Sequence, residues 1–449
     1  MGRLFGTDGA RGVANTEITC ELAMNIGRAA AMVLTEATQK RPFVLIGKDT
    51  RMSSDMLENA LAAGLCSAGA DVDILGVVPT PTVAYLVSKY NADAGIMISA
   101  SHNPCEFNGI KLFNGEGFKL PDAMEEKIED IVLDNVIPYP QKIGGDIGRV
   151  TYSKYALVHY NRHVAASVET RLDGMRVCID CANGSSSVTA KNLFESLGAQ
   201  VFLLSASPNG TNINEDCGST HMEQLTTFVV NNGFDVGLAF DGDADRCLVV
   251  DETGNMVDGD QIISICAQFM KDEGKLKDNT AVVTVMSNLG FFKFCEANGI
   301  TVSKTKVGDR YVLENMLENG YSIGGEQSGH VIFLDYATTG DGQLTAVQLL
   351  NVMTKTGKKL SELASCMEKF PQITVNVKVS AYGKARFNDD AEVQDAIKKF
   401  EGILGDDGRV LVRMSGTEPL CRVMIEGKDQ KKIEKYANEI ADVIKQRLV

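Results

Sequence analysis

The sequence predicts an α/β protein with three similar mixed α/β domains and a fourth, C-terminal domain of α+β type. Two observations support this prediction. Short apolar runs alternate with amphipathic segments through most of the chain, which is typical of largely parallel strands joined by helices. Beyond residue 370 the pattern changes to strands of alternating polarity between charged helices. The domain boundaries that we predict are 1–154, 155–255, 256–370 and 371–449.

The first domain shows the alternation of strand and helix most clearly. Its expected helices are 21–38 and 54–68, and its expected strands are 43–46, 72–75 and 94–98. Thr80-Pro81 predicts a further helix start, with Thr80 as the N-cap and the proline in the first turn.

The remaining domains are predicted from the same signals. In the second we expect a helix near Tyr155, strands 175–180 and 201–204, helix 188–197, and strands 236–240 and 248–250. In the third we expect helices 260–271, 291–298, 311–318 and one from Gln343, with strands 281–285 and 301–307. Phe370-Pro371 is the expected linker. In the fourth we expect strands 373–379, 410–413 and 422–425, and helix 431–448.

Composition restricts the class of protein. The 449 residues are 44% hydrophobic, so each domain can bury a core. The net charge of −15 disfavours non-specific binding to nucleic acid or to an anionic membrane, and no apolar run has the length of a membrane span. Eleven scattered cysteines indicate free thiols in a reducing cytoplasm. Cys178 and Cys181 form a CxxC pair within an apolar strand, and we expect both to be buried structural thiols.

The most informative motif is Phe240-Asp-Gly-Asp-Ala-Asp-Arg246, in which Asp241, Asp243 and Asp245 follow an apolar run. Carboxylates about 4 Å apart would repel each other by ~4 kcal/mol per pair at a surface-like dielectric constant. A cation removes this repulsion, and oxygen ligands suit a hard ion, Mg²⁺ or Ca²⁺. Since Mg²⁺ binds few carboxylates and keeps places for phosphate oxygens, the motif indicates phosphate chemistry.

Three other interpretations of this triplet stay open at this point. The spacing matches a calcium-binding EF-hand loop with Glu252 at its twelfth position, although Arg246 stands where that loop requires glycine. Asp241 could instead be the nucleophile of an aspartyl-phosphate phosphatase. A solvated acidic turn without an ion is the third interpretation, which the density of carboxylates weakens.

A second polar turn, Ser99-Ala-Ser-His-Asn-Pro104, follows an expected strand. Pro104 biases the preceding residue away from helical geometry and favours an exposed bend. Ser101, with His102 beside it, is a candidate nucleophile, because a serine can carry a phosphoryl group when a cation offsets its charge. A turn serine that only bonds to backbone is the alternative. Lys111 could be a solvated charge, a proton shuttle, or a hydrogen-bond donor to a phosphate group near Ser101.

Two more turns carry candidate binding groups. Arg413-Met-Ser-Gly-Thr-Glu-Pro419, with Arg422 beyond it, offers N–H groups, hydroxyls and guanidinium forks that suit a dianionic phosphate. A Gly-Pro turn with an incidental arginine is the alternative. Glu326, Ser328 and His330 lie between glycines and could bind sugar hydroxyls or an amine.

Two charged segments are given structural roles. Asp258 and Asp260 repeat the Asp-Gly-Asp pattern, but with only two carboxylates, so we interpret them as helix N-capping residues. Lys48-Asp-Thr-Arg51 ends an expected strand, and salt bridging with capping is its default interpretation.

In this order, the four motifs resemble those of the α-D-phosphohexomutase superfamily. They are Ser-Ala-Ser-His-Asn-Pro, Asp-Gly-Asp-Ala-Asp-Arg, Gly-Glu-Gln-Ser-Gly-His and Arg-Met-Ser-Gly-Thr-Glu-Pro. The match covers essentially the whole chain. The opening segment 5–12 and Gln327 are most similar to the branch that acts on glucosamine phosphates. The resemblance implies four domains around a central cleft, each contributing one loop.

The resemblance also implies roles for individual residues. Ser101 would be the phosphoserine, and Mg²⁺ would be bound by its phosphoryl oxygen together with Asp241, Asp243 and Asp245. The residues implied in phosphoryl transfer and acid–base assistance are Arg11, His102, Lys111, Arg246 and His330. Glu326 and Ser328 would hold the sugar hydroxyls. The non-reacting phosphate would be held by Arg413, Ser415, Gly416, Thr417 and Arg422. Asp309 and Arg310 fall in the loop of the third domain without an assigned role.

The implied reaction interconverts glucosamine 6-phosphate and glucosamine 1-phosphate through a phosphoserine enzyme and a bisphosphorylated sugar. It would supply UDP-N-acetylglucosamine and cell-wall synthesis in the cytoplasm. The alternatives are a phosphomannomutase or phosphoglucomutase of the same fold, and a non-catalytic sugar-phosphate sensor. The expected partner is the sugar phosphate, with no nucleic acid and no membrane. A homodimer and a priming kinase or sugar bisphosphate are further partners that the resemblance allows.

Overall fold

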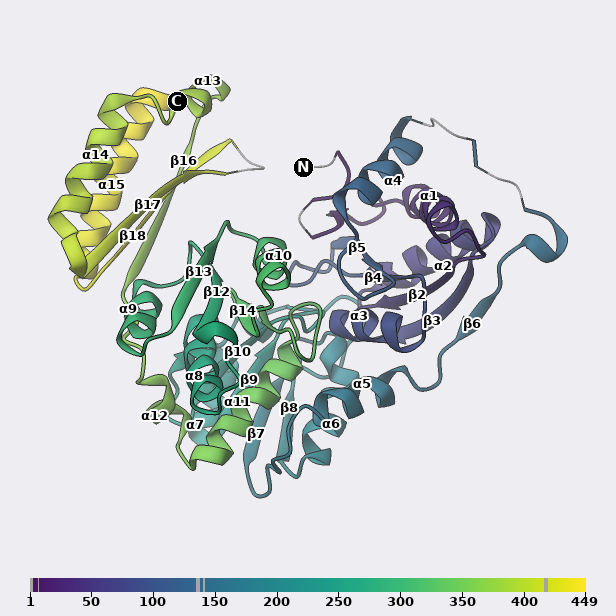
Figure 1. The fold of residues 1–449 in the computed structure, drawn as a ribbon, viewed down its shortest axis with the longest axis horizontal. Helices are drawn as coiled ribbons and strands as arrows, with labels where there is room; N and C mark the ends of the chain where they lie inside the picture. The colour runs from purple at the N-terminus through teal and green to yellow at the C-terminus, as the bar shows by residue number, and fades with distance from the viewer. Residues whose placement is uncertain (1–2, 7, 135–137, 140–141, 416–418) are drawn as a thin grey trace. The chain divides into compact units, whose positions relative to one another are not determined.

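The computed structural model describes residues 3–6, 8–134, 138–139, 142–415 and 419–449 (Figure 1). The chain divides into two compact units, described separately below. The first comprises Met1–Met286 with Ile300–Cys366, and the second comprises Ser287–Gly299 with Met367–Val449.

The first sheet has the strand order β1-β5-β4-β2-β3-β6. Its strands are β1 (Ala10–Val13), β2 (Phe43–Lys48), β3 (Asp71–Val77), β4 (Ala94–Ile98), β5 (Phe107–Asn114) and β6 (Val150–Tyr152). The helices of this segment are α1 (Cys20–Thr38), α2 (Met52–Ser67), α3 (Thr80–Lys89) and α4 (Asp122–Asp134). Val44 and Ile46 join one core with α1, α2 and α4, while Leu45 joins another with α3. Strand β2 is therefore buried on both faces, as its continuous apolar run requires.

The second sheet has the order β11-β10-β9-β7-β8. Its strands are β7 (Arg176–Asp180), β8 (Gln200–Leu204), β9 (Val236–Phe240), β10 (Cys247–Asp251) and β11 (Met256–Val257). The helices are α5 (Ala156–Ala165), α6 (Ala190–Ser196) and α7 (Glu223–Asn232).

The third sheet has the order β13-β12-β14-β15. Its strands are β12 (Thr280–Thr284), β13 (Thr301–Thr305), β14 (Ile323–Gly325) and β15 (Val331–Phe333). The helices of the surrounding segment are α8 (Gly259–Asp272), α9 (Leu289–Ala297), α10 (Asp309–Asn319), α11 (Gly342–Thr356) and α12 (Leu360–Ala364). Short 3₁₀ helices in the described residues are Gly144–Asp146, Ser185–Val188, Gly218–Thr220, Lys277–Asn279 and Gly405–Asp407.

These three sheets repeat one topology, which confirms the prediction of three similar mixed α/β layers. Each repeat has four strands, and within the sheet they lie in the order second, first, third, fourth along the chain. The three orders are β3-β2-β4-β5, β8-β7-β9-β10 and β13-β12-β14-β15. In each, two parallel pairings are followed by one antiparallel pairing. The chain reverses between the third and fourth strands of each repeat. The polar turns 99–104, 241–246 and 326–330 all occupy this one position.

The second unit contains the α+β layer predicted for the end of the chain. Its antiparallel sheet has the order β16-β18-β17, formed by β16 (Gln372–Lys378), β17 (Gly408–Met414) and β18 (Leu420–Gly427). Its helices are α13 (Ala381–Arg386), α14 (Ala391–Leu404) and α15 (Gln430–Leu448). Helices α14 and α15 lie side by side along the sheet (Figure 1), and their apolar faces share its core.

The expected linker Phe370-Pro371 lies within this second unit rather than at its edge. The Phe370 N–H donates to Asn288 Oδ1 at 3.0 Å, and Asn288 Nδ2 donates to the Phe370 carbonyl at 2.9 Å. The segment Ser287–Gly299, which carries α9, is thereby grouped with the C-terminal sheet. The chain therefore passes between the units at three places: 286/287, 299/300 and 366/367.

Two capping expectations have different outcomes. Asp258 caps α8 in a capping box with Gln261, as expected, whereas Asp260 lies inside the helix. The prediction that Thr80 caps α3 is wrong, because Pro79 holds the N-cap position and Thr80 is already helical. The Thr80 hydroxyl instead donates to Asp243 Oδ2 at 2.6 Å.

Cys178 and Cys181 are buried free thiols, as predicted. Within the part of the chain that the structure describes, no helix has the combined length and apolar character needed to cross a membrane.

Candidate active site

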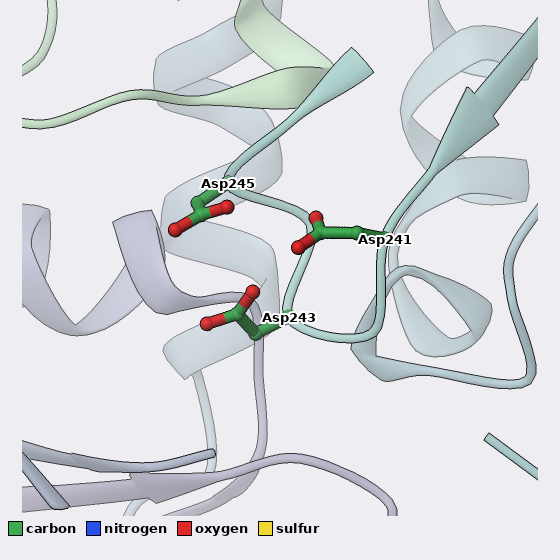
Figure 2. A group of neighbouring side chains, drawn as sticks. All are labelled: Asp241, Asp243 and Asp245. Carbon is green, nitrogen blue, oxygen red and sulfur yellow. The ribbon is translucent and has the colours of Figure 1, made fainter. Parts of the chain in front are cut away.

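Asp241, Asp243 and Asp245 lie on the turn between β9 and β10, and their carboxylates face one another (Figure 2). One oxygen from each lies within 4.8 Å of the others. The three residues are 1%, 0% and 4% exposed. The turn requires a left-handed residue, and Ala244 takes that conformation at φ 56°. The predicted acidic cluster is therefore a buried pocket and not a solvated turn.

The acidic pocket contains buried carboxylate oxygens whose charge a bound cation would neutralise. Burial, followed by the charges of Asp245 and Asp243, raises the pKa of Asp241 well above its usual value. Burial also opposes ionisation of Asp245, but Lys111, His330 and Arg246 outweigh it and hold the pKa of Asp245 far below the usual range. Among the described residues, Asp243 Oδ1 and Asp245 Oδ1 are buried without a hydrogen-bond partner. Buried carboxylate oxygens without partners are costly, and a metal ion bound between them would satisfy both.

An EF-hand does not fit this geometry. The triplet is flanked by strands β9 and β10 rather than by helices. Glu252, which would be the twelfth ligand, accepts from the Ser361 hydroxyl at 2.5 Å and from the Ser361 N–H at 3.3 Å. Its carboxylate is thus committed away from the triplet.

Ser101 reaches the acidic pocket from the first sheet. Its Oγ donates to Asp241 Oδ2 at 2.5 Å, although the two residues are 140 positions apart in sequence. Ser101 is 1% exposed, so the bend after β4 is buried at this residue even though Pro104 is exposed. His102 Nδ1 lies 3.4 Å from Ser101 Oγ. Burial and the neighbouring Arg246 and Arg11 lower the pKa of His102 to about 4, so its imidazole is neutral near pH 7.

Lys111 is the cation in closest contact with the acidic pocket. Its Nζ lies 2.8 Å from Asp243 Oδ2, 3.4 Å from Asp245 Oδ2 and 3.2 Å from Asp8 Oδ2. Burial lowers the pKa of Lys111, but the attraction of Asp243, Asp8 and Asp245 is stronger and raises it well above the usual value. Lys111 is therefore a permanent ammonium, which can neutralise charge and donate hydrogen bonds but is a poor acid and a poor base.

Two arginines complete the positive side of the pocket. The backbone N–H of Arg246 donates to Asp241 Oδ1 at 3.2 Å, and the side-chain Nε of Arg246 lies 3.9 Å from Asp245 Oδ1. Arg11 on β1 forms an ion pair with Asp8. The Nε atoms of Arg11 and Arg246 are buried without a hydrogen-bond partner among the described residues. Both guanidinium groups therefore keep a donor for an incoming anion.

His330 links the acidic pocket to residues to which the sequence assigned no role. His330 Nδ1 lies 3.7 Å from Asp245 Oδ2, and Nε2 lies 3.5 Å from Asp309 Oδ2. Burial lowers the pKa of His330, but hydrogen bonding and charge from Asp245, followed by Asp309, give a net rise. Lys119 then bridges Asp309 at 2.6 Å and Asp8 at 2.8 Å. Lys119 lies outside the motifs, and Asp8 lies in the opening segment 5–12 without an assigned role, so only the fold reveals their place beside Asp309.

The other expected residues of the third repeat lie nearby in the turn between β14 and β15. Glu326 Oε1 accepts from the Gly308 N–H at 3.2 Å, and burial raises the pKa of Glu326. The Ser328 hydroxyl is buried without a hydrogen-bond partner in the described part of the chain, so it can accept a ligand group. Arg310 is instead engaged on the surface with Asp122 and Glu314.

The second unit carries a separate basic cluster. Arg413 on β17 pairs directly opposite Arg422 on β18. Burial and the charge of Arg422 lower the pKa of Arg413, and like charges facing each other across a sheet favour a bound anion. Lys384, which the sequence motifs did not flag, donates to the Ser415 carbonyl at 2.7 Å. Gly416 and Thr417 lie outside the described residues.

Comparison with known proteins identifies the class to which this fold and site belong. Models of the four phosphoglucomutase/phosphomannomutase domains match in order: α/β/α domain I at residues 2–136, domain II at 158–254, domain III at 258–370 and the C-terminal domain at 375–443. The chain belongs to the phosphoglucomutase/phosphomannomutase family.

Full-length relatives narrow the comparison to one branch. The chain is 58% identical to phosphoglucosamine mutase of Acetivibrio thermocellus over 448 residues, covering 100% of both chains. It is 56% identical over 453 residues to phosphoglucosamine mutase of Caldicellulosiruptor saccharolyticus, again covering 100% of both.

Solved structures agree in fold. A phosphoglucomutase/phosphomannomutase family protein of Burkholderia thailandensis matches with a TM-score of 0.83 at 22% identity, over 99% of this chain and 97% of that one. An Aspergillus fumigatus N-acetylphosphoglucosamine mutase, solved with GlcNAc-6P and magnesium, matches with a TM-score of 0.72 at 16% identity, over 99% and 96%.

Proposed function

We propose that this protein is a phosphoglucosamine mutase, an isomerase that interconverts glucosamine 6-phosphate and glucosamine 1-phosphate. The observation that carries the proposal is the 2.5 Å hydrogen bond from Ser101 Oγ to Asp241 Oδ2. It joins a buried candidate nucleophile to a pocket built for a cation. The names of the full-length relatives support the choice of an amino-sugar phosphate as substrate.

The reaction needs two phosphoryl transfers through Ser101. In the first, phosphorus forms a bond to the free sugar hydroxyl oxygen while its bond to Ser101 Oγ breaks. The sugar hydroxyl loses its proton to a base and the serine oxygen gains a proton. The sugar bisphosphate then reorients in the site. In the second transfer, its other phosphoryl group passes from the sugar oxygen to Ser101 Oγ, which regenerates phosphoserine. Such transfers depend mainly on in-line positioning and charge neutralisation.

The residues around Ser101 supply both requirements. Lys111, Arg11 and Arg246 place positive charge beside the serine, where the transferred group carries negative charge. The neutral imidazole of His102 lies 3.4 Å from Ser101 Oγ and can accept or relay a proton there. The carboxylates of Asp245 and Asp309 raise the pKa of His330, while its Nε2 accepts from the Gly340 N–H at 3.1 Å, so the imidazole is a candidate for acid–base assistance.

We propose Mg²⁺ as the metal, held by Asp241, Asp243 and Asp245. The fit rests on two unpartnered buried carboxylate oxygens and on an all-oxygen donor set. When bound, the ion would neutralise charge on phosphate oxygens.

The sugar and its second phosphate need binding groups of their own. Glu326 and the unpartnered Ser328 hydroxyl suit sugar hydroxyls or the substrate amine. The opposed Arg413 and Arg422 suit the phosphate that is not reacting. A homodimer, and a kinase or sugar bisphosphate that first phosphorylates Ser101, belong to the same proposal.

The test combines mass analysis with turnover. The peptide that contains Ser101 should carry one phosphate in active enzyme, and the Ser101→Ala variant should lose turnover while keeping its fold. Turnover of glucosamine 6-phosphate should exceed that of glucose 6-phosphate and mannose 6-phosphate; the reverse order would indicate a phosphoglucomutase or phosphomannomutase. A sensor would bind the sugar without converting it, and an aspartyl-phosphate phosphatase would release inorganic phosphate without Ser101.

A further inference from the structure

The backbone of Ser101 has an unusual conformation for its residue type. Its φ is 53°, in the left-handed region that non-glycine residues rarely adopt. Such a conformation is strained and persists only when its surroundings hold it. The nucleophile therefore depends on groups that fix the turn 99–104.

Arg51 is the first of these groups. Its side chain is 0% exposed and donates from Nη2 to the Ser101 carbonyl at 3.2 Å and to the Asn103 carbonyl at 2.5 Å. Its Nε donates to the Phe107 carbonyl at 2.7 Å. A single buried guanidinium group thus holds three carbonyls in and just after the turn. The salt bridging expected for the segment 48–51 is confirmed, because Arg51 pairs with Asp49 and Lys48 pairs with Asp55. The capping role is wrong: Arg51 stands at the N-cap position of α2, but its side chain makes no cap hydrogen bond.

Asp49 connects Arg51 back to the N–H group of the nucleophile. Its Oδ2 accepts from Arg51 Nη1 at 2.6 Å and from the Ser99 hydroxyl at 2.7 Å. The Ser99 hydroxyl in turn accepts from the Ser101 N–H at 2.9 Å. Both backbone polar groups of Ser101 are therefore tied to one buried ion pair.

Asn214 reaches the same carbonyls from the second repeat. Its Nδ2 donates to the Ser101 carbonyl at 2.9 Å and to the Asn103 carbonyl at 3.0 Å. Asn214 is itself left-handed at φ 58° and is 8% exposed. The turn 241–246 packs directly against the Ser101 turn, because a Cβ atom on Gly242 would lie 2.6 Å from the Ser101 carbonyl oxygen.

We propose that Arg51, Asp49, Ser99 and Asn214 form a clamp of positioning residues for phosphoryl transfer, a role that rests on the proposed function. The clamp fixes the direction of Ser101 Oγ from two repeats at once, so that the phosphoryl group stays in line with the acceptor hydroxyl in both transfers. None of these side chains needs to touch the substrate. Displacing reacting groups by about 1 Å can lower a rate by about 100-fold, so loss of the clamp should act on kcat.

The sharpest test is the Asn214→Gly variant. Glycine adopts φ 58° without strain, so the backbone is kept and only the clamping amide is lost. The matched control is Asn91→Gly, since Asn91 is also left-handed, at φ 53°, but is exposed and precedes β4, whereas the turn 99–104 follows the other end of that strand. Ser99→Ala is a second variant, which removes the acceptor for the Ser101 N–H.

We expect kcat for glucosamine 6-phosphate to fall by about 10- to 100-fold in Asn214→Gly and in Ser99→Ala, with KM within about twofold. Phosphorus NMR of the phosphorylated full-length enzyme should show a shifted or broadened phosphoserine resonance in both variants. Asn91→Gly should match the unmodified protein in all three measurements.

Two results would overturn the clamp. One is a kcat within twofold of the unmodified protein in both clamp variants. The other is a loss of kcat that disappears when rates are divided by the folded fraction, with an unchanged phosphorus resonance, which would leave only a structural role. Failure of the unmodified protein to convert the sugar phosphate would instead refute the proposed function.

Discussion

Replacing Lys111 with methionine should destabilise the metal-free protein strongly and the metal-bound protein much less. The Lys111 ammonium lies 2.8 Å from Asp243 and 3.2 and 3.4 Å from Asp8 and Asp245. At an effective dielectric constant of about 20, these contacts are worth ~6, ~5 and ~5 kcal/mol. Burying the four ions offsets most of that gain, and breaking such a buried group typically costs about 3–5 kcal/mol, because uncompensated charge remains.

The assay is denaturant unfolding of the first unit, once in EDTA and once in excess Mg²⁺. We expect a loss of about 3–5 kcal/mol in EDTA, and a smaller loss in Mg²⁺, because a bound cation replaces part of the missing charge. The matched control is Lys40→Met, whose side chain is 59% exposed and pairs with Asp93 at 2.8 Å. Loss of this surface pair should cost less than about 1 kcal/mol in either buffer. If Lys111→Met costs no more than the control in EDTA, the electrostatic account of the acidic pocket is incorrect.

Three further predictions follow from other groups. Burial raises the pKa of Glu426 to about 7 despite its ion pair with Arg409. Because this folded-state pKa lies above the unfolded value, the free energy of unfolding should fall by up to ~1.4 kcal/mol per pH unit as the pH rises from about 4.5 to 7. Glu426→Gln should flatten that slope in unfolding experiments at several pH values, and an unchanged slope would contradict the assignment. EDTA should abolish turnover and Mg²⁺ restore it, while Asp243→Asn should raise the Mg²⁺ concentration for half-maximal activity by more than about 10-fold; equal Mg²⁺ dependence would exclude this residue as a ligand. Arg413→Ala should weaken sugar-phosphate binding by about 10- to 100-fold through loss of charge-assisted hydrogen bonds worth ~1.5–3 kcal/mol, measured calorimetrically, and unaltered affinity would refute its phosphate-binding role.

Most elements could be predicted because hydrophobic periodicity is local. The strand before the acidic triplet, helix α1 and the alternating strand β16 were all expected near their observed bounds. The short strand β1 was missed, since its four residues, Ala-Arg-Gly-Val, carry little periodic signal. Thr80 was misassigned as a cap because its actual partner, Asp243, lies 163 positions away. Capping rules use only neighbouring residues and cannot include such a contact.

Some residues of the candidate site could likewise be predicted from the sequence, whereas others could not. Asp241, Asp243 and Asp245 could be selected from sequence because clustered carboxylates are chemically unusual at any turn. Lys119 and Asn214 stand singly in ordinary surroundings, and Asp8 lies in the segment 5–12 without an assigned role. Only their distances to charged partners or to the Ser101 turn mark these three residues. The resemblance to a known superfamily supplied roles for the motif residues, but it gave no role to Arg51.

Local residue patterns set the chemistry available to this protein: a serine turn, a carboxylate triplet, the turn that carries Glu326, Ser328 and His330, and paired arginines. Which of these groups meet depends on how the chain folds. The same strand order, repeated three times, puts the turns of the first unit at equivalent positions, and long-range packing then brings Ser101 to within 2.5 Å of Asp241. Local composition sets what each group can do, whereas the charge balance of the pocket arises only when distant residues share one buried volume.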